Sequence, residues 1–111
     1  MKVASFLEDI KFNTSKPAVS MLLETDFSKE IRIVFKKGQL MKDHKAPFPI
    51  VVQVLKGSIN FGIQAEIKQL NTGDLITLNS NTVHNLTATE ESIVRLTLSK
   101  SDSFKRVEKV L

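Results

Sequence analysis

The chain has 111 residues, 41% of them hydrophobic and 25% charged, with a net charge of +4 and no cysteine, tyrosine or tryptophan. A chain of this length can bury one hydrophobic core, so we expect a single domain. The lack of cysteine excludes disulfides and thiolate metal ligands. Because the basic residues are spread along the chain and no aromatic stacking platform is indicated, we expect no nucleic-acid partner.

The N-terminal residues do not have the character of a secretory or membrane-inserted segment. Glu8, Asp9 and Lys11 interrupt the apolar residues there, and no later apolar run approaches the length of a membrane span. We therefore expect a cytoplasmic protein with no membrane partner.

Residues 1–17 are expected to form a short N-terminal helix and a linker. Val3, Phe6 and Ile10 recur at helical spacing, and Pro17 ends a polar cluster that cannot continue a helix. We expect this helix to cap one end of the domain, with binding to a partner as the alternative.

Between residues 18 and 100 the apolar residues alternate as in β-strands. The strand candidates are Val19 to Glu24, Ile31 to Phe35, Ile50 to Val54, Ile59 to Ile63, a run at Ile67, Leu75 to Leu78, Val83 to Leu86 and Ile93 to Leu98. Turn-forming residues separate them, so we expect eight or nine strands in an antiparallel sandwich or barrel. Residues 101–111 form a tail of the same domain, in which Phe104, Val107 and Leu111 fit either a helical turn or a last strand.

Two segments, Gly38 to Gly57 and Gly73 to Ala88, each place one histidine near a turn. In the first, His44 lies six residues after the glycine and is followed by Pro47 and a closing Val-Leu-x-Gly. In the second, a Gly-Asp pair precedes His84. In this register the chain resembles a cupin. The resemblance implies an all-β double-stranded β-helix, or jelly-roll barrel, here with a short N-terminal helix.

The resemblance also implies a metal site of which only part is kept. His44 and His84 fall on ligand positions of the family, whereas Ala46 and Ile50 stand where a second histidine and a glutamate are usual. A catalytic zinc or iron site normally needs three protein ligands, so we expect weak divalent-metal binding at the two histidines, if any. The family's Pro-x-Gly turn ends here at Asn81, a residue that tolerates the positive φ of that glycine.

The resemblance places His44 on the interior face of the barrel mouth, with His84 facing it from another strand across the mouth. Strand alternation adds Ala46, Ile50 and Val52 to the same interior face. These five residues form the expected ligand pocket. Three interpretations of the histidines stay open: hydrogen bonding to a small organic ligand, a two-histidine metal site completed by water, and no function.

We therefore expect a cupin-like protein that binds a small organic ligand without metal-dependent catalysis and needs no cofactor. The alternative is a metal-dependent cupin enzyme, a dioxygenase or isomerase, that uses His44 and His84. A dimer with a structural or regulatory role is a third possibility. Asp43 and Gln53 are not expected to replace the missing ligands, because alternation turns both to the opposite face.

The strands also carry residues expected on the outside of the domain. Arg32 and Arg95 interrupt apolar strands and are expected to point outward, the alternative being that one enters the barrel and neutralises a carboxylate ligand. Val51, Gln53 and Leu55 alternate with interior residues and so lie on the outer face. Apolar surface at that face predicts a homodimer.

Overall fold

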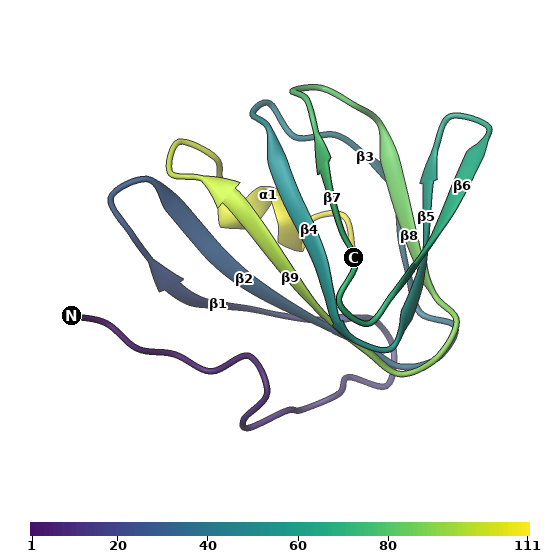
Figure 1. Cartoon of the computed structure of the whole chain (residues 1–111), viewed down its shortest axis with the longest axis horizontal. Helices are drawn as coiled ribbons and strands as arrows, with labels where there is room; N and C mark the ends of the chain where they lie inside the picture. The colour runs from purple at the N-terminus through teal and green to yellow at the C-terminus, as the bar shows by residue number, and fades with distance from the viewer.

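The computed structural model describes residues 1–111 as two antiparallel β-sheets and one short helix (Figure 1). One sheet comprises β1 (Ala18–Glu24), β2 (Ser28–Phe35), β4 (Ile50–Lys56), β7 (Leu75–Leu78) and β9 (Ser92–Ser99). The other comprises β3 (Leu40–His44), β5 (Ser58–Ile63), β6 (Glu66–Asn71) and β8 (His84–Ala88). The strand orders are β1-β2-β9-β4-β7 and β3-β8-β5-β6, and strand pairing stays within each sheet. The expected all-β fold is confirmed.

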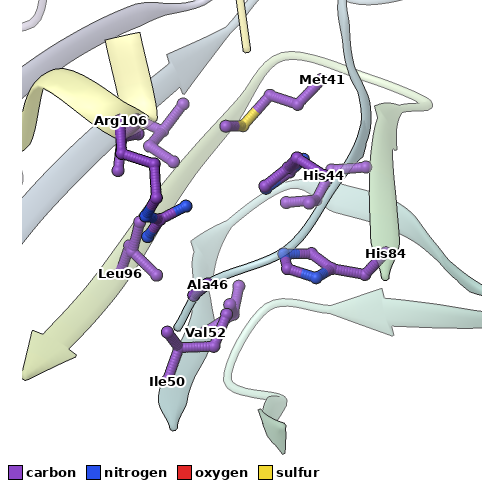
Figure 2. Close-up of a pocket in the computed structure, with 11 residues that line it drawn as sticks. Met41, His44, Ala46, Ile50, Val52, His84, Leu96 and Arg106 are labelled. Carbon is purple, nitrogen blue, oxygen red and sulfur yellow. The ribbon is translucent and has the colours of Figure 1, made fainter. Parts of the chain in front are cut away.

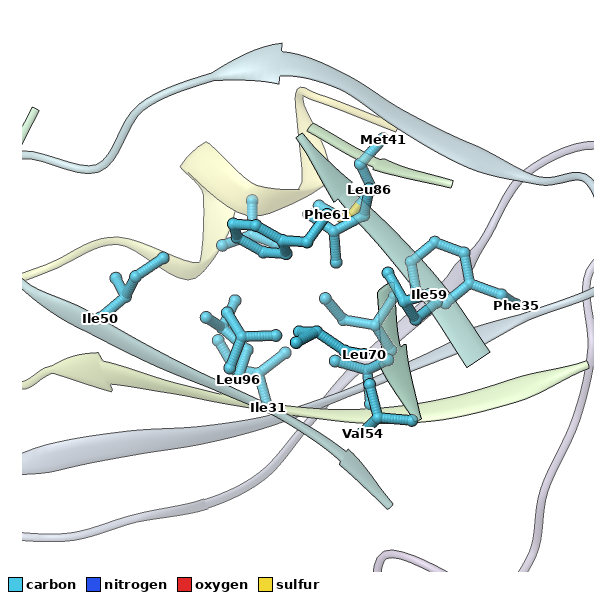
Figure 3. Packing of buried hydrophobic residues seen from close by; sticks show 14 of the residues in the cluster. Ile31, Phe35, Met41, Ile50, Val54, Ile59, Phe61, Leu70, Leu86 and Leu96 are labelled. Atoms are coloured by element: carbon cyan, nitrogen blue, oxygen red, sulfur yellow. The ribbon is translucent and has the colours of Figure 1, made fainter. Parts of the chain in front are cut away.

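The inner faces of the two sheets pack against each other and form one core of 18 buried residues. Strand β4 shows why: Ile50, Val52 and Val54 are buried, while the intervening Val51 and Gln53 are only half-buried. Apolar side chains at every second position give each sheet one apolar face, and burial of that face away from water stabilises the fold. Figure 3 shows side chains from both sheets meeting in this core, among them Ile31, Val54, Leu96, Ile59, Phe61 and Leu86.

The expected N-terminal helix is wrong: residues 1–17 form no helix and run past the five-stranded sheet on its outer side (Figure 1). The guanidinium of Arg32 on β2 donates to the carbonyl of Glu8 at 2.8 Å, and it also reaches the carbonyls of Phe6 and Asp9 at 3.4 and 3.5 Å. These carbonyls are thus engaged by a side chain rather than by helical N–H groups. Asp9 has φ of 54°, which a right-handed helix cannot contain.

Arg32 and Arg95 both point to the outer face of the five-stranded sheet, so the alternative in which one enters the interior is wrong. The two are direct partners across the β2–β9 pair. Arg32 binds the N-terminal segment outside the sheet, and the guanidinium of Arg95 lies 5.8 Å from the ring centre of Phe6 in that segment. The segment therefore covers two like charges that the sheet register places side by side.

Glu30 compensates this positive charge. Its carboxylate accepts hydrogen bonds from Ser28 at 2.8 Å, from Arg95 Nε at 2.9 Å and from Thr97 at 2.7 Å. Burial by itself would raise the pKa of Glu30, but these three bonds outweigh burial and hold it below its usual value. The outer cluster thus contains an ionised carboxylate with donors on both oxygens.

The C-terminal tail adopts the helical alternative. Helix α1 (Phe104–Glu108) and the C-terminus lie between the two sheets at the end where the sheets diverge (Figure 1). Val107 is buried in the core, and Val110 and Leu111 pack against the core as well. The tail therefore covers this end of the core. The structure contains no helix with the length and apolar character needed to cross a membrane.

Candidate functional site

His44 ends β3 and His84 begins β8, and the two are direct partners in this antiparallel pair. The two rings meet at one cavity, as expected, but they lie side by side on neighbouring strands of one sheet and do not face each other across the barrel mouth. Direct cross-strand partners place their side chains next to each other on one face. The ring centres are 4.2 Å apart with the planes tilted by 59°, and the ring of His84 also stacks on Phe61 at 5.4 Å.

Both histidines line a cavity between the sheets (Figure 2). Ala46, Ile50 and Val52 line it as well, so all five residues expected at the pocket surround one space. The rest of the wall consists of apolar side chains and one arginine, namely Ile33, Met41, Leu86, Leu96, Val107 and Arg106. The cavity volume is about 20 Å³, which is room for about one water molecule.

The turn that precedes His84 has the conformation expected from the sequence. Asn81 has φ of 63°, in the region that asparagine tolerates better than most residues. Its N–H donates to the carbonyl of Ala46 at 2.7 Å. This bond ties the turn to the segment that follows β3, and so helps to fix the two cavity walls relative to each other.

A main-chain carbonyl two residues earlier orients each histidine ring. Nδ1 of His44 lies 2.7 Å from the carbonyl oxygen of Lys42, and Nδ1 of His84 lies 2.8 Å from that of Thr82. A carbonyl oxygen can only accept, so each Nδ1 carries the proton, and Nε2 of each neutral ring is a bare acceptor. Neither Nε2 has a hydrogen-bond partner in the protein.

The surroundings keep both imidazoles neutral at pH 7. Burial lowers the pKa of His84 to about 4, and the neighbouring His44 and Arg106 act in the same direction. Burial also lowers the pKa of His44, again helped by the cation of Arg106. The bonds to the main-chain carbonyls offset only part of these effects. The cavity therefore offers two uncharged nitrogen acceptors.

Arg106 is the polar residue of the cavity that the sequence patterns did not indicate. Its guanidinium forms a fork with the buried carboxylate of Asp102, from Nε to Oδ1 at 2.8 Å and from Nη2 to Oδ2 at 2.7 Å. Nη1 donates to the carbonyl of Lys45 at 3.3 Å. Figure 2 shows the guanidinium on the opposite side of the cavity from the ring of His84. The i,i+4 spacing of Asp102 and Arg106 is the only signal for this pair in the sequence.

The cavity does not fit a catalytic metal centre. Two imidazole nitrogens are available, but Ala46 and Ile50 supply no ligand atom, and nowhere do three His, Cys, Asp or Glu side chains come together. Asp43 accepts a hydrogen bond from Asn85 at 2.8 Å on the exposed side of its sheet. Two neutral ligands are one short of the usual set for zinc or iron.

No protein-family model matches the sequence, and neither does any curated protein sequence. Solved structures match over most of the chain. An RmlC-like cupin protein from Desulfovibrio desulfuricans is 21% identical with a TM-score of 0.80, over 90% of this chain and 97% of that one. A conserved protein with a double-stranded β-helix domain from Klebsiella pneumoniae is 20% identical with a TM-score of 0.81, over 93% of this chain and 94% of that one.

An RmlC-like cupin from Shewanella frigidimarina gives the same result, with 21% identity and a TM-score of 0.75 over 91% of this chain and 93% of that one. Identities this low establish the fold and leave the site to be argued from its own residues. The chain therefore has the double-stranded β-helix fold of the small cupin proteins.

Proposed function

We propose that the protein binds a small polar organic molecule at the cavity between His44, His84 and Arg106, without metal-dependent catalysis. The proposal rests on the two Nε2 acceptors that have no partner in an otherwise aliphatic cavity. Both histidines line the cavity, so a molecule bound there can donate hydrogen bonds to these nitrogens.

The cavity volume limits which part of a ligand can be buried. About 20 Å³ holds one water-sized group, so a single hydroxyl or similar group fits beside the histidines. The rest of the ligand must extend to the mouth, where the side chain of Arg106 is 22% exposed. A larger ligand would have to displace α1 from the core.

The alternative is a metal-dependent dioxygenase or isomerase that uses His44 and His84. The observation in its favour is that each neutral imidazole keeps the Nε2 lone pair that a metal ligand needs. The missing third ligand counts against it. We therefore expect divalent metal to bind weakly or not at all.

Two titrations test the proposal against this alternative. Calorimetric titration with zinc should show no tight site in the wild type, and Ala46→His with Ile50→Glu should create one because both positions line the cavity. Tight zinc binding that His44→Ala abolishes would favour the enzyme. Addition of small alcohols and hydroxy acids should shift the ring NMR signals of His44 and His84. Ring signals that none of these compounds moves would contradict the proposed binding.

We also propose a homodimer through the outer face of the five-stranded sheet. Val51, Gln53 and Leu75 form a shallow groove there with Arg95 and Thr97, and Leu75 is 62% exposed. The terminal nitrogens of Arg95 have no partner in the chain, and the amide oxygen of Gln53 can accept from them. A two-fold pair requires one patch to hold such complementary groups, so a second copy is the occupant that this face suits best.

A further inference from the structure

We infer that the ligand is a small hydroxylated carboxylate, with a hydroxyl group that donates to one of the two histidine nitrogens and the carboxylate at Arg106. This inference rests on the proposed function and names the chemical class of its ligand. It follows from the two kinds of hydrogen-bonding group that remain free at the cavity: acceptors on one wall and a cationic donor on the other (Figure 2).

The histidine wall selects the buried end of the ligand. The Nε2 atoms of His44 and His84 are acceptors only, so a carboxylate, which also only accepts, would meet unfavourable lone pairs there. An ammonium group could donate, but the cation of Arg106 lies on the same cavity. A hydroxyl group donates one hydrogen bond without charge, to one of the two nitrogens, and it has the size of the water molecule that the volume allows.

Arg106 selects the other end. A guanidinium has five N–H groups, and three of those of Arg106 are used by Asp102 and Lys45, which leaves two free. A carboxylate matches a guanidinium in shape and charge, and charge-assisted hydrogen bonds are the stronger ones. The free N–H groups at the mouth thus suit the charged end of a ligand whose hydroxyl is buried.

Asp102 is the positioning residue for this contact. Its side chain is 1% exposed and binds one edge of the guanidinium through two hydrogen bonds, so the free N–H groups have a fixed direction. The ammonium of Lys29 donates to the main-chain carbonyl of Asp102. This second cation keeps the surroundings of the buried carboxylate positive, so the site retains attraction for an anion.

Three probes of matched size separate the two ends: glycerate has hydroxyls and a carboxylate, glycerol has only hydroxyls, and propionate has only a carboxylate. Binding can be measured from the changes in the ring NMR signals of the histidines. We expect glycerate to bind the wild type at least about tenfold more tightly than glycerol or propionate. Arg106→Gln should reduce glycerate affinity to that of glycerol. Lys105→Gln, which removes the preceding positive charge from an exposed position of α1, should leave glycerate affinity unchanged.

Arg106→Lys is the companion variant, because it keeps the charge if Arg106→Gln loosens the tail. It should bind glycerate more weakly than the wild type but more tightly than Arg106→Gln, since the planar fork is lost and the cation remains. Equal binding of glycerol and glycerate, unchanged by Arg106→Gln, would overturn the inference while leaving the proposed function standing. If none of the three probes moves the signals of His44 and His84, both the inference and the proposed function are contradicted.

Discussion

Glu30 on the outer side of the five-stranded sheet and the two histidines in the cavity between the sheets differ in how far their hydrogen-bond acceptors are used. On the outer side, Glu30 accepts three hydrogen bonds, from Ser28, Arg95 and Thr97. On the inner side, the Nε2 atoms of His44 and His84 accept none. The carboxylate of Glu30 has donors on both oxygens and stabilises the fold, whereas the two imidazole acceptors line a cavity and remain available to a ligand.

Removing the carboxylate of the outer cluster should have the largest effect on stability. Glu30→Ala leaves Arg32 and Arg95 opposite each other without compensation, and we expect the free energy of unfolding to fall by about 3 kcal/mol in urea denaturation. Glu66→Ala is the matched control, because its pair with Lys68 is exposed on both sides and should contribute less than about 0.5 kcal/mol. Equal losses in the two variants would show that the outer cluster does not stabilise the fold.

The inner cluster should make the protein sensitive to acid. The pKa of His84 is about 4 in the folded protein against 6.5 as its ordinary value, so the unfolded chain binds more protons between these pH values. The free energy of unfolding should therefore fall by roughly 2 kcal/mol as the pH drops from 7 to 4. Arg106 and Asp43 also face this ring, and the pKa of the neighbouring His44 is lowered by burial too, so His44 contributes in the same direction as His84.

A substitution isolates the contribution of that ring. His84→Gln removes the titrating group, and urea denaturation at several pH values should show a flatter dependence between pH 6.5 and 4. The pKa of Glu30 is lowered from 4.5, so this carboxylate destabilises the fold only from about pH 5 downward, and the slope above that pH reports on His84. The same slope in His84→Gln and wild type would mean that the buried ring is not the acid-sensitive group.

The N-terminal segment should depend mainly on Arg32, although Gln39 also donates to the carbonyl of Asn13 and Arg95 lies over the ring of Phe6. Arg32 is 8% exposed and holds the segment through carbonyls, although its Nε has no partner. We expect Arg32→Met to reduce the free energy that holds the N-terminal segment on the sheet by about 1 kcal/mol. The rate of tryptic cleavage after Lys11 should then rise about fivefold. The exposed Lys37→Met should leave that rate unchanged. Cleavage that stays as slow in Arg32→Met would show that other contacts hold the segment.

The smallest effect on stability is expected at the proposed dimer face. Leu75→Asp places like charges in a two-fold contact, so sedimentation equilibrium should show a monomer while the unfolding free energy changes by less than about 0.5 kcal/mol. Ile67→Asp, on an exposed edge strand of the other sheet, should remain dimeric. A wild type that sediments as a monomer at tens of micromolar would refute the dimer.

The strands with strong alternation of apolar residues were predicted from the sequence. The segments whose structure depends on side-chain contacts were missed. Strand β4 alternates buried and half-buried residues and was correctly predicted, whereas β3 buries only Met41 among polar residues and gave no apolar run. The N-terminal helix was wrong because Arg32, distant in the sequence, binds the carbonyls that a helix would use. Local periodicity carries no information on such a contact.

The candidate site was predictable in part. The motif register located His44, His84 and the apolar lining residues, since strand alternation decides which side chains face inward. It did not show that the histidines are neighbours in one sheet, because strand order depends on the whole topology. Arg106 lies in a short tail for which the sequence allowed a helical turn or a strand, and in the structure helix α1 brings it to the cavity.

The state of the two histidine nitrogens tests the account most directly. Long-range proton–nitrogen NMR spectra at pH 7 distinguish protonated from bare ring nitrogens. We predict a protonated Nδ1 and a bare Nε2 in both His44 and His84, with the Nε2 signals shifting on addition of glycerate while Nδ1 stays bonded to its carbonyl. Protonated Nε2 atoms, or Nε2 signals that glycerate does not move, would contradict a ligand site built on two free acceptors.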